Sequence, residues 1–468
     1  MIISPFISVI AYAMLSKPQY EASFNSALSD KIDRIKSIEG RKIVVVGGSS
    51  VAFGLDSEKL EQYTGIPVVN FGLYAAIGTK LMMDLADDYI GKGDIVVLAP
   101  ELDTQALSLY FSAENTLMAA DGDFSVLKGM GSDNILSLLG GMWDLARGKL
   151  RISKKGGLST DSLGIYQSQY FNEYGDFTYE RTENVMDGYY LPNNMIDLNK
   201  ETYSADFDEF CDYVNDYVKR VKKKGATVCF SYCPMNSLAL VEGSMDRAQE
   251  FAEFLDSKLD CDFISYINDY ILDPGYFFDT NYHLNDAGVT VRTIRLAKDI
   301  RLQYSILDNP ITDKEPAAPD LPFADVVFEG EDENAKYFVY SDNPNGSKCI
   351  IGLSELGKTM TELTLPLGVD GRIVSSVSAS AFANSSVEKI VISADSNVTQ
   401  LMNGAFAGAS ELSSLWIYKK SGDEINPPVD FRGVASDFIV HVPIGSDFSI
   451  HYFWSERNIE FAEDINLD

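Results

Sequence analysis

Apolar residues in the first 305 positions follow two alternating patterns. Apolar or mostly apolar runs, as at residues 43–46, 94–98 and 226–234, are typical of strands that are covered on both faces in a parallel sheet. Between them, apolar residues recur every three or four positions, as at residues 207–224 and 246–259, which predicts helices. This alternation predicts an α/β fold with a three-layer arrangement around a parallel sheet.

A long segment, residues 103–200, interrupts this alternation. It is rich in Gly, Ser, Tyr and Asn, with a helical pattern near residues 134–139. Long insertions at the carboxyl edge of a sheet more often form a lid or a substrate wall than a disordered tail. We therefore predict one α/β domain over residues 21–304 that carries an insertion at 103–200.

The pattern changes after residue 304. Residues 305–325 contain four prolines among acidic and small residues, a composition that predicts a linker. Within residues 326–468, two similar stretches begin at Ala381 and Ala405, a period of 24 residues (405 − 381). This period predicts a small β-rich domain built from stacked repeats.

The amino-terminal residues 1–15 are apolar and uncharged. They are too few to span a bilayer and lack the basic residues that precede a signal peptide. We interpret residues 1–20 as part of a membrane anchor or signal anchor, with an ordinary buried helix as the alternative.

Composition narrows the possible functions. The net charge of −31 over 468 residues argues against nucleic acid as a partner, because the negative potential is spread over the chain. Five cysteines form no compact disulfide framework, and we interpret Cys229 and Cys233 as core thiols. We predict neither a metal site nor a cofactor.

The candidate chemistry begins where the first strand ends. Ser49 and Ser50 follow Gly47 and Gly48 directly after the apolar run at 43–46. Ligands of open α/β sheets bind outside the carboxyl ends of the strands, and glycines permit the close backbone approach that a serine nucleophile needs. A structural Gly/Ser loop is the alternative interpretation.

A candidate base lies far downstream in the chain. His283 is the only histidine in the first 440 residues, and Asp279 precedes it by four positions. A neutral imidazole is the usual base for a serine hydroxyl, and a carboxylate can hold its tautomer. A loop histidine that caps a turn is the alternative.

The serine and histidine segments together resemble the SGNH (GDSL-type) hydrolase superfamily over about residues 40–305. Counting back from Gly54, this resemblance assigns the nucleophile and one oxyanion amide to Ser50, with Ser49 in place of the usual Asp. His283 and Asp279 complete the catalytic set that the resemblance implies.

The two middle blocks of that family also have counterparts here. The second block would place an oxyanion amide near Ala75, with Gly72 as a substrate-binding position. In the third block Glu101 stands where the family has an Asn, and a carboxylate cannot donate to an oxyanion unless it is protonated. We expect Glu101 to bind a substrate hydroxyl.

The carboxy-terminal repeats resemble BspA-type leucine-rich repeats of bacterial surface proteins. The two resemblances together imply an extracytoplasmic esterase or O-acyltransferase that acts on cell-envelope carbohydrate through Ser50, His283 and Asp279. The alternative is a catalytically inactive surface adhesion or scaffolding protein that binds a protein partner through its repeats.

Overall fold

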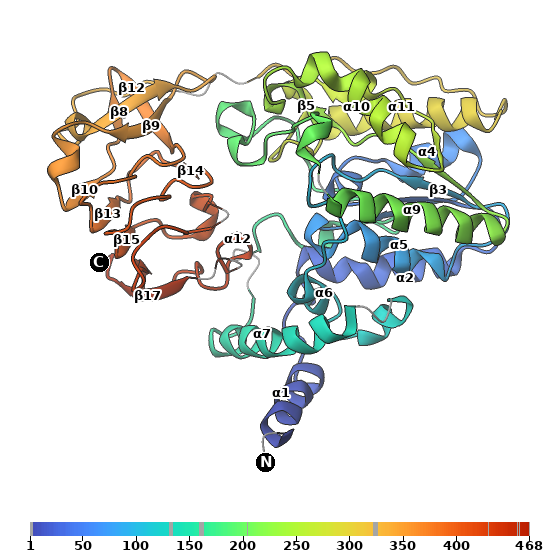
Figure 1. Cartoon of the computed structure of the whole chain (residues 1–468), viewed down its shortest axis with the longest axis horizontal. Coiled ribbons are helices and arrows are strands. Elements are labelled where there is room, and N and C mark those ends of the chain that lie inside the picture. Colours follow the sequence, from blue (N-terminus) through green and yellow to red (C-terminus); the bar gives the residue numbers. More distant parts are fainter. Residues whose placement is uncertain are drawn as a thin grey trace. The chain divides into compact units, whose positions relative to one another are not determined.

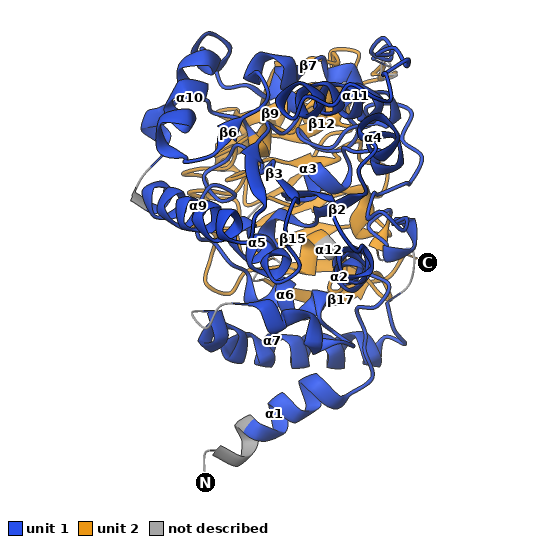
Figure 2. Cartoon of the chain, turned by 90° about the vertical axis from the view of Figure 1, so that its right-hand side faces the viewer, with its two compact units in different colours: residues 1–158, 165–185, 195–321 blue, residues 159–164, 186–194, 322–468 orange. Residues whose placement is uncertain are grey.

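The computed structural model divides the chain into two compact units (Figure 2). Unit 1 comprises residues 1–158, 165–185 and 195–321, and unit 2 comprises residues 159–164, 186–194 and 322–468. The structure describes residues 3–130, 134–158, 163–203, 205–321, 326–428, 430–455, 457 and 459–467.

Unit 1 is built on a five-stranded sheet in which all the neighbouring strands are parallel. The strand order is β2-β1-β3-β4-β6. This confirms the predicted α/β fold with a parallel sheet. The strands are β1 (Ile43–Gly47), β2 (Val68–Gly72), β3 (Ile95–Leu98), β4 (Thr227–Phe230) and β6 (Asp262–Phe263).

Helices cover both faces of this sheet (Figure 1). On one face, α4 (Ser57–Thr64) and α11 (Asp286–Gln303) share a core with Ile43 and Val45 of β1. Successive side chains of a strand point to opposite faces, so Val44 and Val46 are directed to the other layer. That layer contains α2 (Leu28–Ser37), α5 (Thr79–Asp87) and α9 (Ala205–Lys223).

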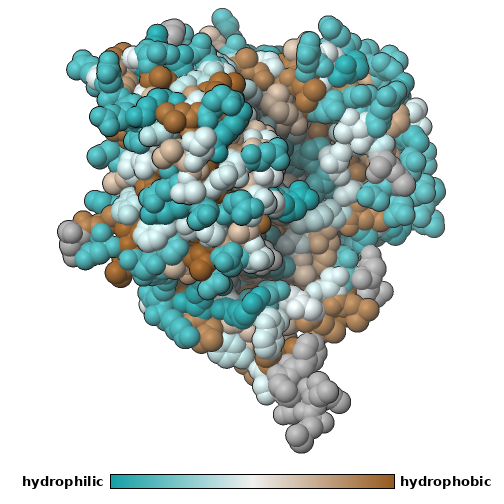
Figure 3. Space-filling model, turned by 60° about the vertical axis from the view of Figure 1, so that its left-hand side comes forward, coloured by the Kyte–Doolittle hydropathy of each residue, from teal (hydrophilic) through white to brown (hydrophobic). Residues whose placement is uncertain are grey.

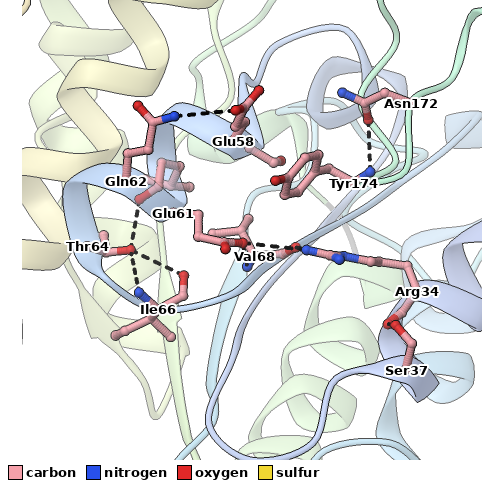
Figure 4. A network of polar contacts seen from close by, with 12 residues as sticks. Arg34, Ser37, Glu58, Glu61, Gln62, Thr64, Ile66, Val68, Asn172 and Tyr174 are labelled. Carbon is pink, nitrogen blue, oxygen red and sulfur yellow. Dashed lines mark hydrogen bonds and ion pairs between the residues drawn. The ribbon is translucent and has the colours of Figure 1, made fainter.

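The edge strand β2 is anchored by charged side chains (Figure 4). Arg34 of α2 donates to the Val68 carbonyl oxygen at 3.3 Å, and the Val68 amide donates to Glu61 at 3.2 Å. Arg34 and Glu61 also form an ion pair at 3.5 Å. These contacts use backbone groups that an edge strand would otherwise expose.

The predicted insertion is shared between the units. It forms α6 (Ala113–Ala119) and α7 (Ile135–Lys154) in unit 1, whereas residues 159–164 and 186–194 belong to unit 2. All other residues of the range 21–304 belong to unit 1. The remaining short elements of unit 1 are α1 (Ile3–Leu15), α3 (Ser49–Ala52), α10 (Ser244–Lys258), β5 (Met235–Asn236) and β7 (Ile271–Leu272).

Most of the predicted linker packs as part of unit 1. Asp313 accepts a hydrogen bond from the Tyr63 hydroxyl at 2.6 Å, and Glu315 pairs with Arg295 at 2.9 Å and with Lys298 at 2.8 Å. Only the last predicted linker residues, 322–325, lie outside the described residues. The proline-rich composition therefore accompanies an ordered segment along residues 305–321.

Unit 2 contains two five-stranded sheets. In the sheet whose strands are all parallel, Lys389, Ser414 and Ile439 pair in register at intervals of 25 residues (414 − 389 and 439 − 414). That sheet runs β10 (Glu362–Thr364), β13 (Lys389–Ile392), β15 (Ser414–Ile417), β16 (Ile439–Pro443) and β17 (Glu460–Ile465). The second sheet contains β8 (Phe338–Asp342), β9 (Lys348–Leu353), β11 (Gly368–Val369), β12 (Arg372–Val377) and β14 (Gln400–Leu401), and α12 (Tyr452–Ser455) follows β16.

A column of aromatic rings runs through the core of unit 2. Phe382 stacks on Phe406 with ring centroids 5.7 Å apart, and Phe406 stacks on Phe431 at 5.5 Å. These residues recur at nearly the interval of the strands, so each structural unit buries its phenylalanine against the next. Phe382 and Phe406 are therefore core residues, as the periodicity predicted.

The cysteines and the helix lengths bear on two further predictions. All five cysteines are described, and each is a buried free thiol, which confirms Cys229 and Cys233 as core residues. Within the described part of the chain, no helix combines the length and apolar character needed to cross a membrane. The apolar amino terminus forms the 13-residue α1.

Candidate active site

The turn after β1 is held tightly against its surroundings. β1 ends at Gly47, and α3 begins at Ser49. A Cβ atom on the intervening Gly48 would lie 2.2 Å from a carboxylate oxygen of Glu101. Only glycine fits this close approach, which fixes where the next residue, Ser49, leaves the strand.

The histidine loop is closed by its own hydrogen bonds. The Phe278 amide donates to the His283 carbonyl oxygen at 2.9 Å, and the His283 amide donates to the Thr280 hydroxyl at 3.0 Å. Asn285 then caps α11 by accepting from the Gly288 amide at 3.0 Å. These bonds bring Asp279 and His283 together on one short loop.

The structure joins this loop to Ser49. His283 Nε2 lies 2.8 Å from Ser49 Oγ, and His283 Nδ1 lies 2.8 Å from Asp279 Oδ1. With a proton on Nδ1 directed at the carboxylate, Nε2 accepts the hydrogen bond that the serine hydroxyl donates. Ser49 is half-buried and His283 is 4% exposed, so the hydroxyl is the more accessible of the two groups.

The prediction that Ser50 meets His283 is wrong. Ser50 is completely buried, and its Oγ has no hydrogen-bond partner among the described residues. Ser49 opens α3, and the next residue of a helix points about 100° away, which turns Ser50 into the interior. The Ser50 carbonyl oxygen also accepts from Arg292, which holds this orientation.

Glu101, three residues after the end of β3, contacts the same turn. Its Oε1 accepts a hydrogen bond from the Ser50 amide at 2.8 Å, and the residue is only 3% exposed. This contact conflicts with the predicted oxyanion role of the Ser50 amide and with substrate binding by Glu101. The buried Arg292 lies nearby; burial lowers the pKa of its guanidinium, and the Glu101 charge acts in the opposite direction.

The second predicted block has a packing role at Gly72. A Cβ atom there would lie 2.4 Å from the Val51 side chain, so Gly72 lets β2 approach α3. Its amide donates to Asn70 Oδ1 at 3.1 Å, and the residue is buried, which argues against the predicted contact with substrate. Ala75 begins a short 3-10 helix and is partly exposed. Its oxyanion role stays a prediction.

Three aromatic residues that the sequence analysis did not single out surround the histidine. The Phe53 ring stacks on the His283 imidazole with centroids 3.9 Å apart and an angle of 8°. Phe177 stacks on the other side of Phe53 at 4.2 Å. The Tyr166 hydroxyl donates to Asp279 Oδ2 at 2.6 Å, leaving Oδ1 for His283. The imidazole plane and its aspartate are therefore both held in place.

A buried cation lies behind this aromatic group. The guanidinium of Arg181 lies 5.1 Å from the centre of the Phe53 ring and 5.5 Å from that of Phe177. Burial lowers the pKa of Arg181, while Asp286 and Asp279 act in the opposite direction. Phe177, Tyr166 and Arg181 all come from the insertion, whose abundance of aromatic residues was the available signal in the sequence.

A second buried polar cluster contacts the serine turn through Asn70. Asn70 of β2 donates to the Val51 carbonyl oxygen at 2.9 Å and to Asp176 at 2.8 Å. Asp176 also accepts from the Ser57 hydroxyl at 2.6 Å. Lys31 donates to the Asn70 carbonyl oxygen at 3.1 Å, and burial lowers the pKa of this lysine to about 7.

The site has the components for nucleophilic chemistry without a metal cluster nearby. Across the described ranges, no group of three or more potential ligands forms a metal site. No family model matches the sequence, and the comparison with curated proteins yields no match either. The geometry of Ser49, His283 and Asp279 therefore carries the functional argument.

Proposed function

We propose that this chain transfers or hydrolyses acyl esters through Ser49, His283 and Asp279. The observation that carries the proposal is the continuous hydrogen-bonded series of these three side chains, with both spacings at 2.8 Å. A serine, a base in hydrogen-bond reach and a carboxylate that orients the base are the recurring parts of serine acyl-transfer enzymes on unrelated folds.

The reaction assigns one task to each residue. Ser49 Oγ attacks the ester carbonyl carbon while His283 Nε2 takes the hydroxyl proton. The tetrahedral intermediate then expels the alcohol, which receives that proton from His283, and an acyl-serine remains. Water or an acceptor hydroxyl releases the acyl group by the same steps in reverse order. Asp279 stabilises the imidazolium that forms twice in this cycle.

The negative charge on the intermediate needs donors close to Ser49. The Ser49 amide is the first of α3, and the first amides of a helix have no carbonyl partner within it. We infer that this amide stabilises the oxyanion, with the Ala75 amide as the second candidate donor. The Ser50 amide does not take part, because it already donates to Glu101.

The substrate class follows from the two family resemblances. With Ser49 as the nucleophile, the spacing to Gly54 is one residue longer than in the SGNH pattern and Gly48 stands in place of the usual Asp, while the serine after the first strand and the late Asp279 and His283 still match it. The parallel strands and stacked phenylalanines of unit 2 support its interpretation as leucine-rich repeats. We infer an extracytoplasmic esterase or O-acyltransferase that acts on cell-envelope carbohydrate.

The test is active-site labelling with a fluorophosphonate, followed by peptide mass spectrometry. We expect the label on Ser49, no labelling in the Ser49→Ala variant, and retained labelling in the matched Ser50→Ala variant. Ester turnover should fall by about 10⁴-fold or more in Ser49→Ala, since the nucleophile and its base act as a unit. Labelling on Ser50, or turnover that survives Ser49→Ala, would overturn the assignment.

A second function, binding without catalysis, is favoured by the position of Glu101. A carboxylate repels the negative charge that acyl transfer develops, and Glu101 stands where SGNH enzymes have an amide donor. Glu101→Gln keeps an acceptor for the Ser50 amide and removes the charge. If the chain is an acyl-transfer enzyme, ester turnover in Glu101→Gln should differ from that of the natural chain by less than about tenfold. If the natural chain turns over ester only at the background rate, and Glu101→Gln raises this turnover strongly, binding without catalysis is the favoured function.

A further inference from the structure

Helix α7 presents apolar side chains on two sides. Leu138, Met142 and Leu145 are buried against the body of unit 1. A separate stripe is exposed and consists of Leu136 (80%), Leu139 (37%), Trp143 (52%) and Leu150 (46%). Its spacings of three, four and seven residues place these four side chains along one face of the helix. We call this set the α7 stripe.

Basic residues border the α7 stripe towards the end of the helix. Four of them are exposed: Arg147, Arg151, Lys154 and Lys155. One acidic residue of the helix, Asp144, pairs with Arg147 at 2.5 Å. The chain as a whole has a net charge of −31, so this local excess of positive charge departs from the rest of the molecule. Hydrophilic residues cover much of the face drawn in Figure 3, where apolar residues occur in small groups.

A buried lysine ties a second apolar helix to α7. Lys149 Nζ donates to the carbonyl oxygens of Ala13 at 3.0 Å and Ser16 at 3.1 Å, and pairs with Asp121 at 2.7 Å. One of these partners, Ala13, lies in the last turn of α1. Figures 1 and 2 both draw α1 beside α7. Leu15 of α1 is 83% exposed, so this helix also leaves apolar surface uncovered.

We propose that the α7 stripe and α1 bind the surface of an anionic lipid bilayer. An amphipathic helix with leucine and tryptophan on one face and arginine and lysine beside it is suited to the boundary between acyl chains and anionic headgroups. In a two-fold contact between copies the same patch lies on both sides, so the basic borders would face and repel each other, which argues against a second copy as the occupant.

The experiment measures binding of the full chain to vesicles by co-sedimentation. Vesicles of phosphatidylcholine alone are compared with vesicles that contain one quarter phosphatidylglycerol. We expect binding to the anionic vesicles, weakened at least about tenfold in Trp143→Glu, because an apolar anchor is lost and a repelled charge is gained. Binding should also weaken when salt rises from 0.1 to about 0.5 M.

The matched control is Leu302→Glu, which changes an 81% exposed leucine of α11 in unit 1. It should bind vesicles as the natural chain does, and circular dichroism should show both variants folded. Equal binding to neutral vesicles, equal loss in both variants, or full binding by Trp143→Glu would overturn the proposal. A dimer that forms without vesicles and is lost in Trp143→Glu would assign the stripe to a second copy instead.

Discussion

The three histidines of this chain all contact an aspartate, but only one also contacts a serine. His283 in unit 1 has Asp279 at 2.8 Å on one nitrogen and Ser49 at 2.8 Å on the other. In unit 2, His441 has Asp464 at 2.9 Å and His451 has Asp423 at 2.8 Å. A histidine and aspartate pair is therefore a common structural device here, and the serine distinguishes the candidate site.

The surroundings of the two pairs in unit 2 indicate packing roles. His451 is 1% exposed, and its Nδ1 has no hydrogen-bond partner among the described residues. Gly422 lies so close that a Cβ atom there would be 2.5 Å from the imidazole. His441 stacks on Trp416 at 4.1 Å on the side of the strand away from the core. Neither ring faces a nucleophile at the end of a buried strand.

The largest difference should appear when the aspartates are changed one at a time. Asp279→Asn should lower ester turnover by about 10²- to 10⁴-fold, because the imidazolium loses its counter-charge and the tautomer is no longer fixed. Asp464→Asn should leave turnover unchanged. Steady-state kinetics on a chromogenic ester measures both variants, and equal activity of the two would remove the distinction between the pairs.

The buried imidazole of His451, whose partner Asp423 is 49% exposed, should show its role in stability. His451→Ala removes a ring that packs against Gly422 and leaves Asp423 without its partner. We expect the free energy of unfolding of unit 2 to fall by about 2 to 3 kcal/mol, while ester turnover of the folded chain stays constant. Thermal unfolding monitored by tryptophan fluorescence measures the loss. A drop in turnover at a temperature where the chain is folded would contradict the packing role.

A smaller effect should separate positioning from catalysis within unit 1. Tyr166→Phe removes the hydrogen bond to Asp279 Oδ2 and keeps the aromatic ring. We expect kcat to fall about tenfold with KM little changed, since one charge-assisted hydrogen bond contributes roughly 1.5 kcal/mol. Tyr266→Phe, at a tyrosine that is 75% exposed, is the matched control and should have no effect. An unchanged kcat would show that Asp279 keeps its position without Tyr166.

The smallest effect belongs to the pair of His441 and Asp464, whose imidazole is less buried than that of His451. The Asp464 side chain is 48% exposed, and the pair with His441 lies at the surface. Asp464→Asn should therefore lower the free energy of unfolding by less than about 1 kcal/mol, because solvent screens such pairs. Denaturant titration measures this value. A loss as large as that of His451→Ala would show that burial of the imidazole does not separate the two pairs.

Local sequence patterns predicted much of the first sheet and half of the site. The apolar residues 43–46 and 95–98 lie in β1 and β3, because a strand buried on both faces needs apolar residues at every position. Asp279 and His283 were found together because both lie on one loop, where a short chain segment limits their separation. The interval of the repeats likewise predicted Phe382 and Phe406 as core residues.

The boundary between the units, after Leu321, falls inside the predicted linker, whereas long-range contacts such as the one between Asp313 and Tyr63 order residues 305–321. Composition indicates how flexible a segment is in isolation. Whether the segment is ordered in the protein also depends on the surface of the folded unit against which it packs. The insertion residues that hold Asp279 and Phe53 beside His283 were missed for the same reason. Tyr166 and Phe177 lie more than one hundred residues from it in the chain.

The sequence by itself determined that a serine turn follows the first strand and that one histidine and aspartate loop precedes the last helix of unit 1. Only the tertiary structure decided that Ser49 faces His283 and that Ser50 is buried beside Glu101. The physical reason is the start of α3. Neighbouring side chains of a helix point about 100° apart, so one serine faces the site and the next one points into the core. Motif spacing counts residues along the chain, whereas the direction of a side chain depends on where the helix begins.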